Sequence, residues 1–175
     1  GHSFGGHCVL GASLLMSNIR RLVVYKTDVP EGMYEAAMPA GLVDRFASLV
    51  DAGDRVAAVT TFLREAFQMT SEEIETAKTW PTFPAMVAAA HTFPRETRAL
   101  ETYRFETKRF ESMTVPTLLL LGGNSPDFAK TPMEKWHSVL PNSRIVEMPG
   151  QQHLAHYTAP DLFVREVVRF VKDTV

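Results

Sequence analysis

The sequence predicts an α/β fold in which a parallel sheet carries helices on both faces. Segments with the composition of short buried strands occur at 21–25, 115–121 and 143–148. Helical patterns separate them, and strands that alternate with helices pair in parallel. The run Val115–Leu121 (VPTLLLL) is apolar throughout, which is typical of a strand covered on both faces.

The chain opens on Gly1-His2-Ser3-Phe4-Gly5, which places a serine between two glycines at the spacing Gly-x-Ser-x-Gly. This is the spacing of a nucleophile elbow, a sharp strand-to-helix turn that lifts one side chain clear of the backbone. We expect glycine on both sides because a Cβ would crowd the turn. The small, apolar run 4–16 predicts a buried helix, so Ser3 would precede a helix N-terminus, where the dipole favours negative charge.

The stretch 31–111 lacks a strong strand pattern and is too long for one crossover. Helical spacing recurs in it, and Thr70-Ser71-Glu72-Glu73 fits a capping box. We therefore predict a helical insertion at 31–111 between the two parts of a core, 1–30 and 112–175. Its large apolar residues either hint at a pocket for a hydrophobic ligand or form the insertion's own core: Phe46, Phe62, Phe67, Met69, Trp80, Phe83 and Met86.

Two more helix starts are predicted nearer the C-terminus. Thr131-Pro132-Met133-Glu134 has the form of a capping box with proline at the first helical position. Thr158-Ala159-Pro160-Asp161 predicts the start of the last helix. We expect that helix to turn its apolar residues toward the sheet, namely Leu162, Val164, Val167, Val168 and Val171.

A loop that carries a histidine, Pro149-Gly150-Gln151-Gln152-His153, follows the last strand. Together with GHSFGG at 1–6 and PTLLLLGGNSPD at 116–127, it gives the chain a resemblance to the serine α/β-hydrolase superfamily over nearly its whole length. In that family nucleophile, acid and histidine follow one another along the chain, each after a strand. The resemblance implies the C-terminal part of an α/β-hydrolase sheet, with 31–111 as a helical cap.

Hydrolases of this family have further strands before the elbow, whereas this chain begins at the elbow's first glycine. We therefore expect the C-terminal portion of a longer protein, whose missing N-terminal segment is its natural partner. Without that segment, the strand at 21–25 is expected to present an unpaired edge, and such edges promote association.

The resemblance implies Ser3 as nucleophile, His153 as base and the backbone N–H of Phe4 as a donor to the oxyanion. A serine hydroxyl is a weak nucleophile at neutral pH, so an imidazole must take its proton. His153 is favoured because its loop follows the last strand, and His156 is the alternative. His2 is expected to be structural.

The triad acid is where the sequence departs from the family. Asn124 stands where the resemblance leads us to expect an aspartate. An amide can accept a hydrogen bond from imidazole, but the loss of charge in an Asp→Asn change costs about 10⁴-fold in kcat in a serine protease. Three alternatives remain: Asp127 in the same loop is the acid, Asp28 after the strand at 21–25 is the acid, or Asn124 only orients His153 and activity is low.

Composition limits the remaining classes. The net charge of −2 and the absence of a basic stripe disfavour nucleic acid and anionic membranes as partners. No run approaches the roughly 18 apolar residues of a membrane span. The single cysteine, Cys8, excludes an internal disulfide and favours a reducing compartment, the cytoplasm; we expect it to be buried. No metal-ligand spacing is present, and neither metal nor cofactor is expected.

These observations predict a serine hydrolase that cleaves a small hydrophobic, ester-like acyl substrate through a Ser-His-acid triad and an acyl-enzyme. Acyl transfer to an alcohol or to peroxide would use the same site. A non-catalytic protein or inactive fragment is the alternative from another class, favoured by Asn124 and by the missing segment. A dehalogenase is disfavoured because its chemistry needs a carboxylate at the elbow, where this chain has Ser3.

Overall fold

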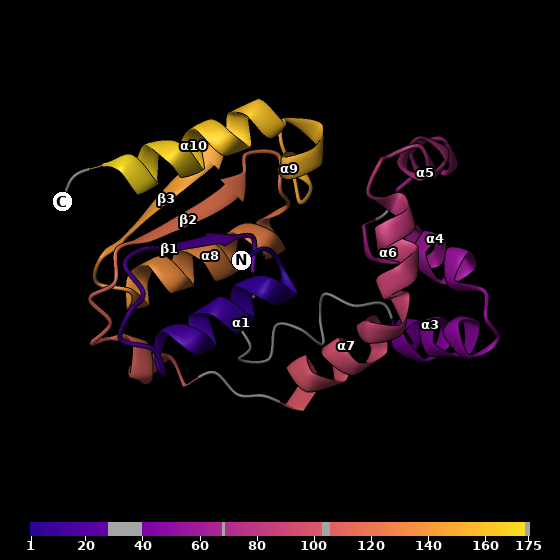
Figure 1. Cartoon of the computed structure of the whole chain (residues 1–175), viewed down its shortest axis with the longest axis horizontal. Helices are drawn as coiled ribbons and strands as arrows, with labels where there is room; N and C mark the ends of the chain where they lie inside the picture. Colours follow the sequence, from indigo (N-terminus) through magenta and orange to yellow (C-terminus); the bar gives the residue numbers. More distant parts are fainter. Residues whose placement is uncertain (28–39, 68, 103–105, 174–175) are drawn as a thin grey trace. The chain divides into compact units, whose positions relative to one another are not determined.

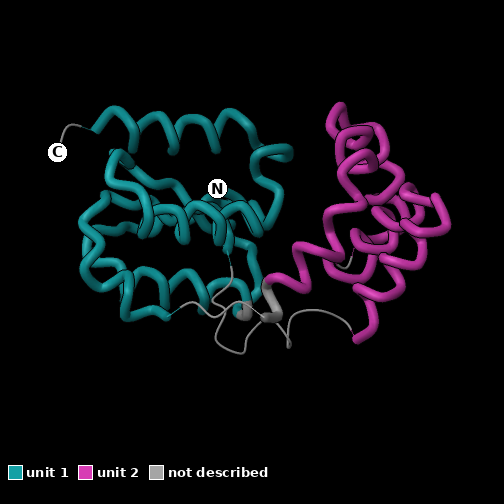
Figure 2. Tube along the Cα trace, turned by 60° about the horizontal axis from the view of Figure 1, so that its bottom comes forward, with its two compact units in different colours: residues 1–29, 105–175 teal, residues 30–104 magenta. Residues whose placement is uncertain are grey.

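The computed structural model describes residues 1–27, 40–67, 69–102 and 106–173. The chain forms two compact units, one of residues 1–29 with 105–175 and the other of residues 30–104 (Figure 2). The first unit contains the whole sheet, and the second is helical. A cap role for the helical unit stays a prediction.

The first unit is built on a parallel sheet, as the sequence predicts (Figure 1). Its strands are β1 (Leu22–Tyr25), β2 (Thr117–Gly122) and β3 (Ser143–Met148), in the order β1-β2-β3. Leu22 lies opposite Thr117, and Leu118 lies opposite Arg144. Strand β2 is therefore central, paired along both edges.

Side chains of β2 alternate between two hydrophobic layers. Leu119 and Leu121 pack with residues of α1 (Phe4–Ser13), η2 (Thr107–Phe110) and α8 (Asp127–Val139). Leu118 and Leu120 pack on the other face with residues of α9 (Ala155–Thr158) and α10 (Pro160–Lys172). Figure 1 shows α1 and α8 on one side of the sheet and α10 on the other. The four leucines are at most 1% exposed, so the prediction of a strand covered on both faces is confirmed.

The first residues of the chain pair with β1. The Gly1 ammonium donates to Val23 O at 2.7 Å, and the Tyr25 N–H donates to Gly1 O at 2.8 Å. Ser3 N–H donates to Tyr25 O at 3.0 Å, and His2 forms a parallel bridge with Tyr25. The expected unpaired edge is therefore wrong for this half of β1, because the elbow's own backbone occupies it.

Helix α8 begins earlier than predicted. It starts at Asp127, directly after Pro126 in an extended conformation (φ −65°, ψ 159°), and Pro132 lies inside the helix. Instead of capping a helix, Thr131 donates its hydroxyl to the carbonyl of Asp127 at 3.1 Å. The predicted capping box at 131–134 is therefore wrong.

Helix α10 begins at Pro160 as predicted, but only part of its apolar surface faces the sheet. Leu162 and Val167 pack against the layer that contains Phe170. Three valines that were expected there are exposed instead: Val164 at 55%, Val168 at 40% and Val171 at 52%. Successive residues of an α-helix are rotated by about 100° about its axis. The three exposed valines therefore lie on a different side of α10 from Leu162 and Val167, and only one of these sides can pack on the sheet.

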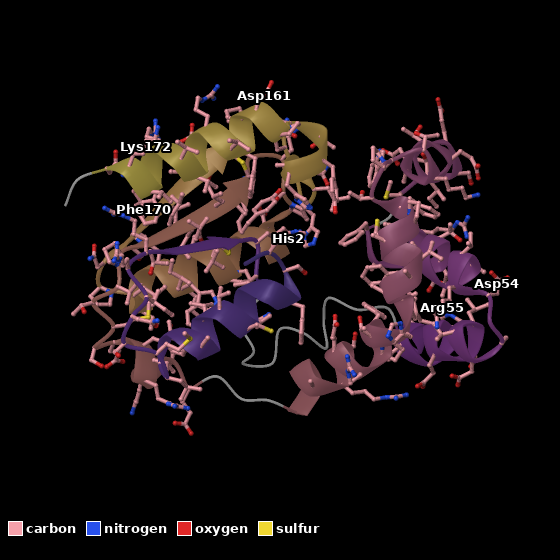
Figure 3. The ribbon with its side chains drawn as sticks, viewed as in Figure 1. His2, Asp54, Arg55, Asp161, Phe170 and Lys172 are labelled. Carbon is pink, nitrogen blue, oxygen red and sulfur yellow. The ribbon has the colours of Figure 1, made fainter. Side chains whose placement is uncertain are left out.

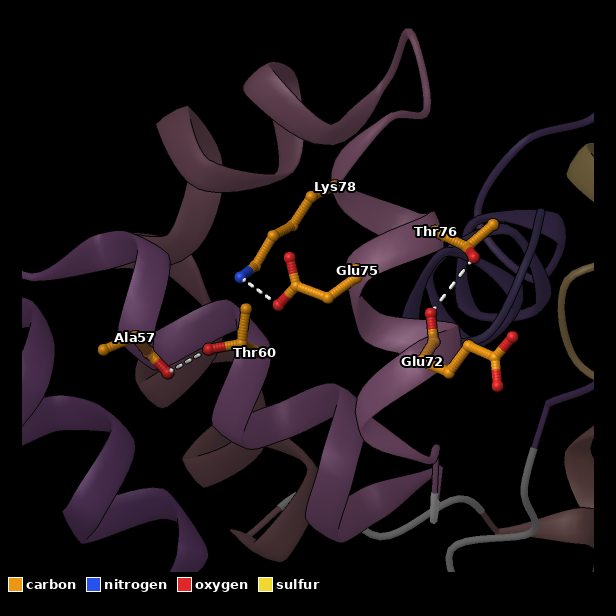
Figure 4. Close-up of polar contacts among 6 residues, drawn as sticks. All are labelled: Ala57, Thr60, Glu72, Glu75, Thr76 and Lys78. Carbon is orange, nitrogen blue, oxygen red and sulfur yellow. Dashed lines mark hydrogen bonds and ion pairs between the residues drawn. The ribbon is translucent and has the colours of Figure 1, made fainter.

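The helical unit contains α3 (Leu42–Asp51), α4 (Arg55–Ala66), α5 (Ser71–Lys78), α6 (Phe83–Ala89), η1 (Ala90–Thr92) and α7 (Phe93–Thr102). The capping box at Thr70 and Glu73 is confirmed, with both reciprocal hydrogen bonds present. Figure 4 shows contacts within these helices, including the Lys78–Glu75 ion pair of 2.6 Å and the Thr76 hydroxyl bonded to Glu72 O. All seven apolar residues singled out above belong to the unit's own hydrophobic cluster.

Two further expectations concern Cys8 and the membrane. Cys8 is exposed, contrary to expectation, because α1 buries Gly6, His7 and Leu10 on another face. Across the described ranges, no helix has both the length and the apolar character needed to cross a bilayer. Residence in the cytoplasm stays a prediction.

We expect Leu120→Asp to abolish folding. Leu120 is fully buried, and an unpaired buried carboxylate costs several kcal/mol, comparable with the whole stability of a domain. Leu15→Asp is the matched control, since Leu15 is 80% exposed. Circular dichroism during urea unfolding should show a cooperative transition in the control alone. Cooperative unfolding of Leu120→Asp near the native midpoint would contradict the packing of β2.

Candidate active site

All three strands end at the same edge of the sheet because they run parallel. The segments that follow them are Lys26-Thr27 after β1, Gly123–Pro126 after β2 and Pro149–Leu154 after β3. His2 and Ser3, which pair with the end of β1, lie at this edge as well (Figure 3 labels His2). In open α/β sheets, ligands bind outside the carboxyl ends of the strands. The candidate site is therefore this edge.

Ser3 has a strained backbone. Its dihedral angles are φ 50° and ψ −122°, and it forms the N-cap of α1 without a capping bond from its side chain. A non-glycine residue persists in such a conformation only where its surroundings impose it, and such residues cluster at active sites. Here Ser3 N–H donates to Tyr25 O, while Ser3 O accepts from Gly6 N–H at 2.8 Å and from the Thr27 hydroxyl at 3.1 Å.

The glycines around Ser3 are not equally constrained. A Cβ on Gly1 would lie 2.2 Å from Gly5 O, so the predicted need for glycine at Gly1 is confirmed. A Cβ on Gly5 would meet no described atom within 4 Å, so the predicted crowding there is not found. Gly6 is the second tight position, because a Cβ there would lie 2.8 Å from Thr27 Cβ.

Ser3 and Phe4, the residues predicted as nucleophile and oxyanion donor, lie at the start of α1. Phe4 is the first residue of α1, and the first N–H groups of a helix have no intrahelical acceptor. Its N–H therefore lies where the helix dipole favours negative charge. The Ser3 hydroxyl makes no hydrogen bond to a described residue, so the Ser3–His153 contact stays a prediction. Catalytic hydrogen bonds are often long in unliganded enzymes.

Two side chains hold the loop that carries His153. The Tyr25 hydroxyl donates to Gln152 O and accepts from Ala155 N–H at 2.9 Å, so it bonds on both sides of His153. Nε2 of His2 lies 2.9 Å from His153 O. A carbonyl only accepts, so Nε2 of His2 carries the proton. His2 thus has the structural role expected of it, and that role is to fix the histidine loop.

The surroundings of His153 keep its imidazole neutral. Burial is the largest cause that lowers the pKa of His153 well below its usual value, and the positive charges of Lys26, His2 and His156 lower it further. Burial also lowers the pKa of His2 to about 4. The ring of His2 lies 4.6 Å from that of His153 and 4.5 Å from that of His156. A neutral His153 can accept a proton at pH 7.

The structure joins neither acid candidate that it describes to His153. Asn124 is exposed, and only its backbone N–H reaches the histidine loop, at Gln151 O (2.9 Å). Asp127 is exposed in the first turn of α8, and its carboxylate makes no hydrogen bond or ion pair with a described residue. Asp28 lies outside the described residues. The charges that act on the pKa of His153 are instead the positive charges of Lys26, His2 and His156.

Sequence reasoning missed Tyr25, Lys26 and Thr27 as parts of the site. Their signal in the sequence is their position at the carboxyl end of a predicted strand, where α/β sheets place functional groups. In the described part of the chain, no group of three His, Cys, Asp or Glu side chains is arranged to hold a metal ion.

The model of the alpha/beta hydrolase family matches residues 1–166 of the chain. The chain belongs to the alpha/beta hydrolase family. Nothing among the curated proteins matches the sequence. The parallel sheet with helices on both faces is thus the fold of this family.

Solved structures of the family show the same fold. An alpha/beta hydrolase from Sphaerobacter thermophilus is 28% identical with a TM-score of 0.78, and the match covers 98% of this chain and 66% of that one. A bromoperoxidase from Bacillus anthracis is 22% identical with a TM-score of 0.70, over 99% of this chain and 66% of that one. A proline iminopeptidase from Mycobacterium smegmatis is 20% identical with a TM-score of 0.63, over 98% and 63%. The chain thus spans about two thirds of their length.

We expect acid to destabilise this protein because its buried histidines take up protons on unfolding. Burial lowers the pKa of His7 to about 4, whereas an unfolded histidine titrates near 6.5. Stability that is complete above pH 6.5 is therefore lost as the pH falls towards 4. At pH 5 the loss is roughly 2 kcal/mol for such a histidine. Urea unfolding at pH 7 and pH 5 measures it.

His7→Gln and His91→Gln isolate that contribution. His91 is exposed on η1, so its replacement should leave the difference between the two pH values unchanged. In His7→Gln the difference should shrink. Equal pH dependence in the unchanged protein and both variants would refute the lowered pKa of His7.

Tyr25→Phe should loosen the histidine loop while keeping the buried ring. Loss of the hydroxyl leaves Gln152 O and Ala155 N–H without their partner, and an unsatisfied buried polar group costs about 1–3 kcal/mol. Amide hydrogen exchange should accelerate at Ala155. Tyr157→Phe is the control, since Tyr157 is exposed on α9. Unchanged exchange at Ala155 in Tyr25→Phe would show that the hydroxyl does not hold the loop.

Proposed function

We propose that this chain is the nucleophile- and histidine-bearing part of a serine hydrolase for ester-like acyl substrates. The backbone of Ser3 carries the proposal: φ 50° and ψ −122° at the N-cap of α1. A serine in this conformation at a strand-to-helix turn presents its hydroxyl at the sheet edge, as a nucleophile requires. The hydrogen bonds that the backbone of Ser3 makes with Tyr25 and Thr27 hold it in this conformation.

The proposed reaction assigns each group one step. Ser3 Oγ attacks the carbonyl carbon of the ester, and His153 takes the hydroxyl proton. The carbonyl oxygen becomes an oxyanion, which the Phe4 N–H stabilises together with the dipole of α1. The tetrahedral intermediate expels the alcohol, which receives the proton from His153. Water then attacks the acyl-enzyme by the same path and releases the acid.

The proposed substrates are specified only as ester-like acyl compounds. The seven large apolar residues of the helical unit pack into that unit's own core, so they give no independent support for a hydrophobic acyl chain. A small hydrophobic substrate therefore stays a proposal based on the family resemblance. Transfer of the acyl group to an alcohol or to peroxide would need the same Ser3 and His153.

A second candidate function is a weakly active or non-catalytic member of the family. The cation of Lys26 acting on His153 favours it, because imidazolium formed during attack gains no stabilisation from a neighbouring positive charge. This candidate shares the elbow with the first and differs in the rate at which Ser3 reacts.

Labelling with a fluorophosphonate tests the first candidate. We expect covalent modification at Ser3, read by peptide mass spectrometry, and its loss in Ser3→Ala. Ser17→Ala is the matched control because Ser17 is exposed beyond the end of α1. Hydrolysis of a short-chain chromogenic ester should follow the same pattern. A well-folded chain that stays unlabelled under saturating reagent would favour the non-catalytic candidate.

A further inference from the structure

The outward side of α10 carries a stripe of exposed valines. Val164, Val168 and Val171 are 55%, 40% and 52% exposed. Their spacing of four and three residues makes them neighbours on one side of the helix. That side faces away from the sheet, because Phe170 points toward the strands and belongs to the hydrophobic layer beneath them (Figure 3). The valine stripe is therefore not part of the core of its own unit.

One charged side chain adjoins the valine stripe at each end. Asp161 lies three residues before Val164, and Lys172 lies four residues after Val168, so each is a helical neighbour of the stripe. Figure 3 shows Asp161 and Lys172 on the side of α10 away from the strands. A helix rises about 1.5 Å per residue, so the two lie about 16 Å apart along its axis. Opposite charges thus frame the valines.

The other charges of α10 are paired, whereas these two are not. Arg165 and Arg169 approach the carboxylate of Glu166 to 3.6 Å and 2.7 Å. Asp161 and Lys172 are exposed, and neither forms an ion pair with any residue that the structure describes. Their signs suit the dipole of their own helix, but the dipole gives no reason for the valines between them. An apolar stripe with an unpaired charge at each end is typical of a helix surface that packs against another helix.

We propose that a second copy of this chain covers the valine stripe, with the two α10 helices packed antiparallel about a twofold axis. The valines of one copy then pack on the valines of the other, and Asp161 of each copy faces Lys172 of the other. A parallel arrangement would bring like charges together at both ends. Twofold contacts between identical patches are the commonest interfaces of oligomers, and charges beside an apolar seam set the orientation of paired helices.

The positions of the two charges around α10 allow both ion pairs to form at once. Successive residues are rotated by about 100°, which places Asp161 and Lys172 within about 20° of each other around the axis. Both therefore lie on the same flank of the valine stripe. A twofold axis perpendicular to two antiparallel helices brings equal flanks together. Arg165 lies on this flank as well, where the carboxylate of Glu166 offsets its charge.

Sedimentation velocity over about 5–500 μM measures the association. Three valines per copy form a small contact compared with the interfaces of stable complexes, so we expect a weak dimer with a Kd on the order of 100 μM. Val168→Glu puts a charge in the middle of the stripe and should raise the Kd at least 10-fold. Val56→Glu is the matched control, since Val56 is 45% exposed on α4 of the helical unit. Circular dichroism should show that both variants are folded.

Charge reversal tests the antiparallel arrangement. Asp161→Lys sets two cations against each other at both ends of the stripe and should raise the Kd at least 5-fold. The double variant Asp161→Lys with Lys172→Asp exchanges the two charges, and it should restore the Kd to within 2-fold of the unchanged chain. Glu72→Lys is the matched control, because it makes the same change of charge in the first turn of another helix, α5, and should leave the Kd unchanged.

Three results would overturn the proposal. The first is an unchanged chain that sediments as a monomer even at about 500 μM. The second is Val168→Glu that associates as tightly as the unchanged chain, which would place the contact on another surface, such as Leu15 and Met16 beyond the end of α1. The third is a double variant that stays as weak as Asp161→Lys. These measurements involve neither Ser3 nor His153, so they are separate from the test of the proposed hydrolase.

Discussion

The end of β1 at Tyr25 holds both halves of the candidate site. Its backbone N–H and C=O pair with Gly1 and Ser3, which fixes the strained turn before α1. Its hydroxyl bonds to Gln152 and Ala155, which fixes the loop around His153. One residue thus fixes both Ser3 and the loop that carries His153 to the same strand. Burial raises the pKa of Tyr25 to about 12, so its hydroxyl stays protonated and keeps donating.

Several titratable and positively charged groups surround His153 in the candidate site. His2, His153 and His156 lie together, and burial lowers the pKa of each of them. Neutral imidazoles are ready to accept a proton, but a lowered pKa makes them weak bases. Lys26 strengthens this effect on His153. Under the proposed function, the turn at Ser3 favours catalysis while the positive charges around His153 slow it, and this balance separates the two candidate functions.

Local sequence patterns were enough to predict the framework. The run of leucines at 118–121 specifies a strand buried on both faces, because no polar residue interrupts either face of its two-residue period. The turn at Ser3 and the capping box at Thr70 depend only on residues that are close in the chain. Both are found where the sequence predicts them. The start of α8 was misplaced because proline fits both the first turn of a helix and, as Pro126 shows, the extended residue before it.

The sequence by itself determined the parallel α/β core, the serine turn and the position of His153 after the last strand. Only the tertiary structure decided which face of α10 packs on the sheet. It also revealed the bonds of Tyr25 to the histidine loop, which join residues 127 and 130 positions apart. Local propensity acts over a few residues, whereas burial and side-chain partners depend on segments that folding brings together from distant parts of the chain.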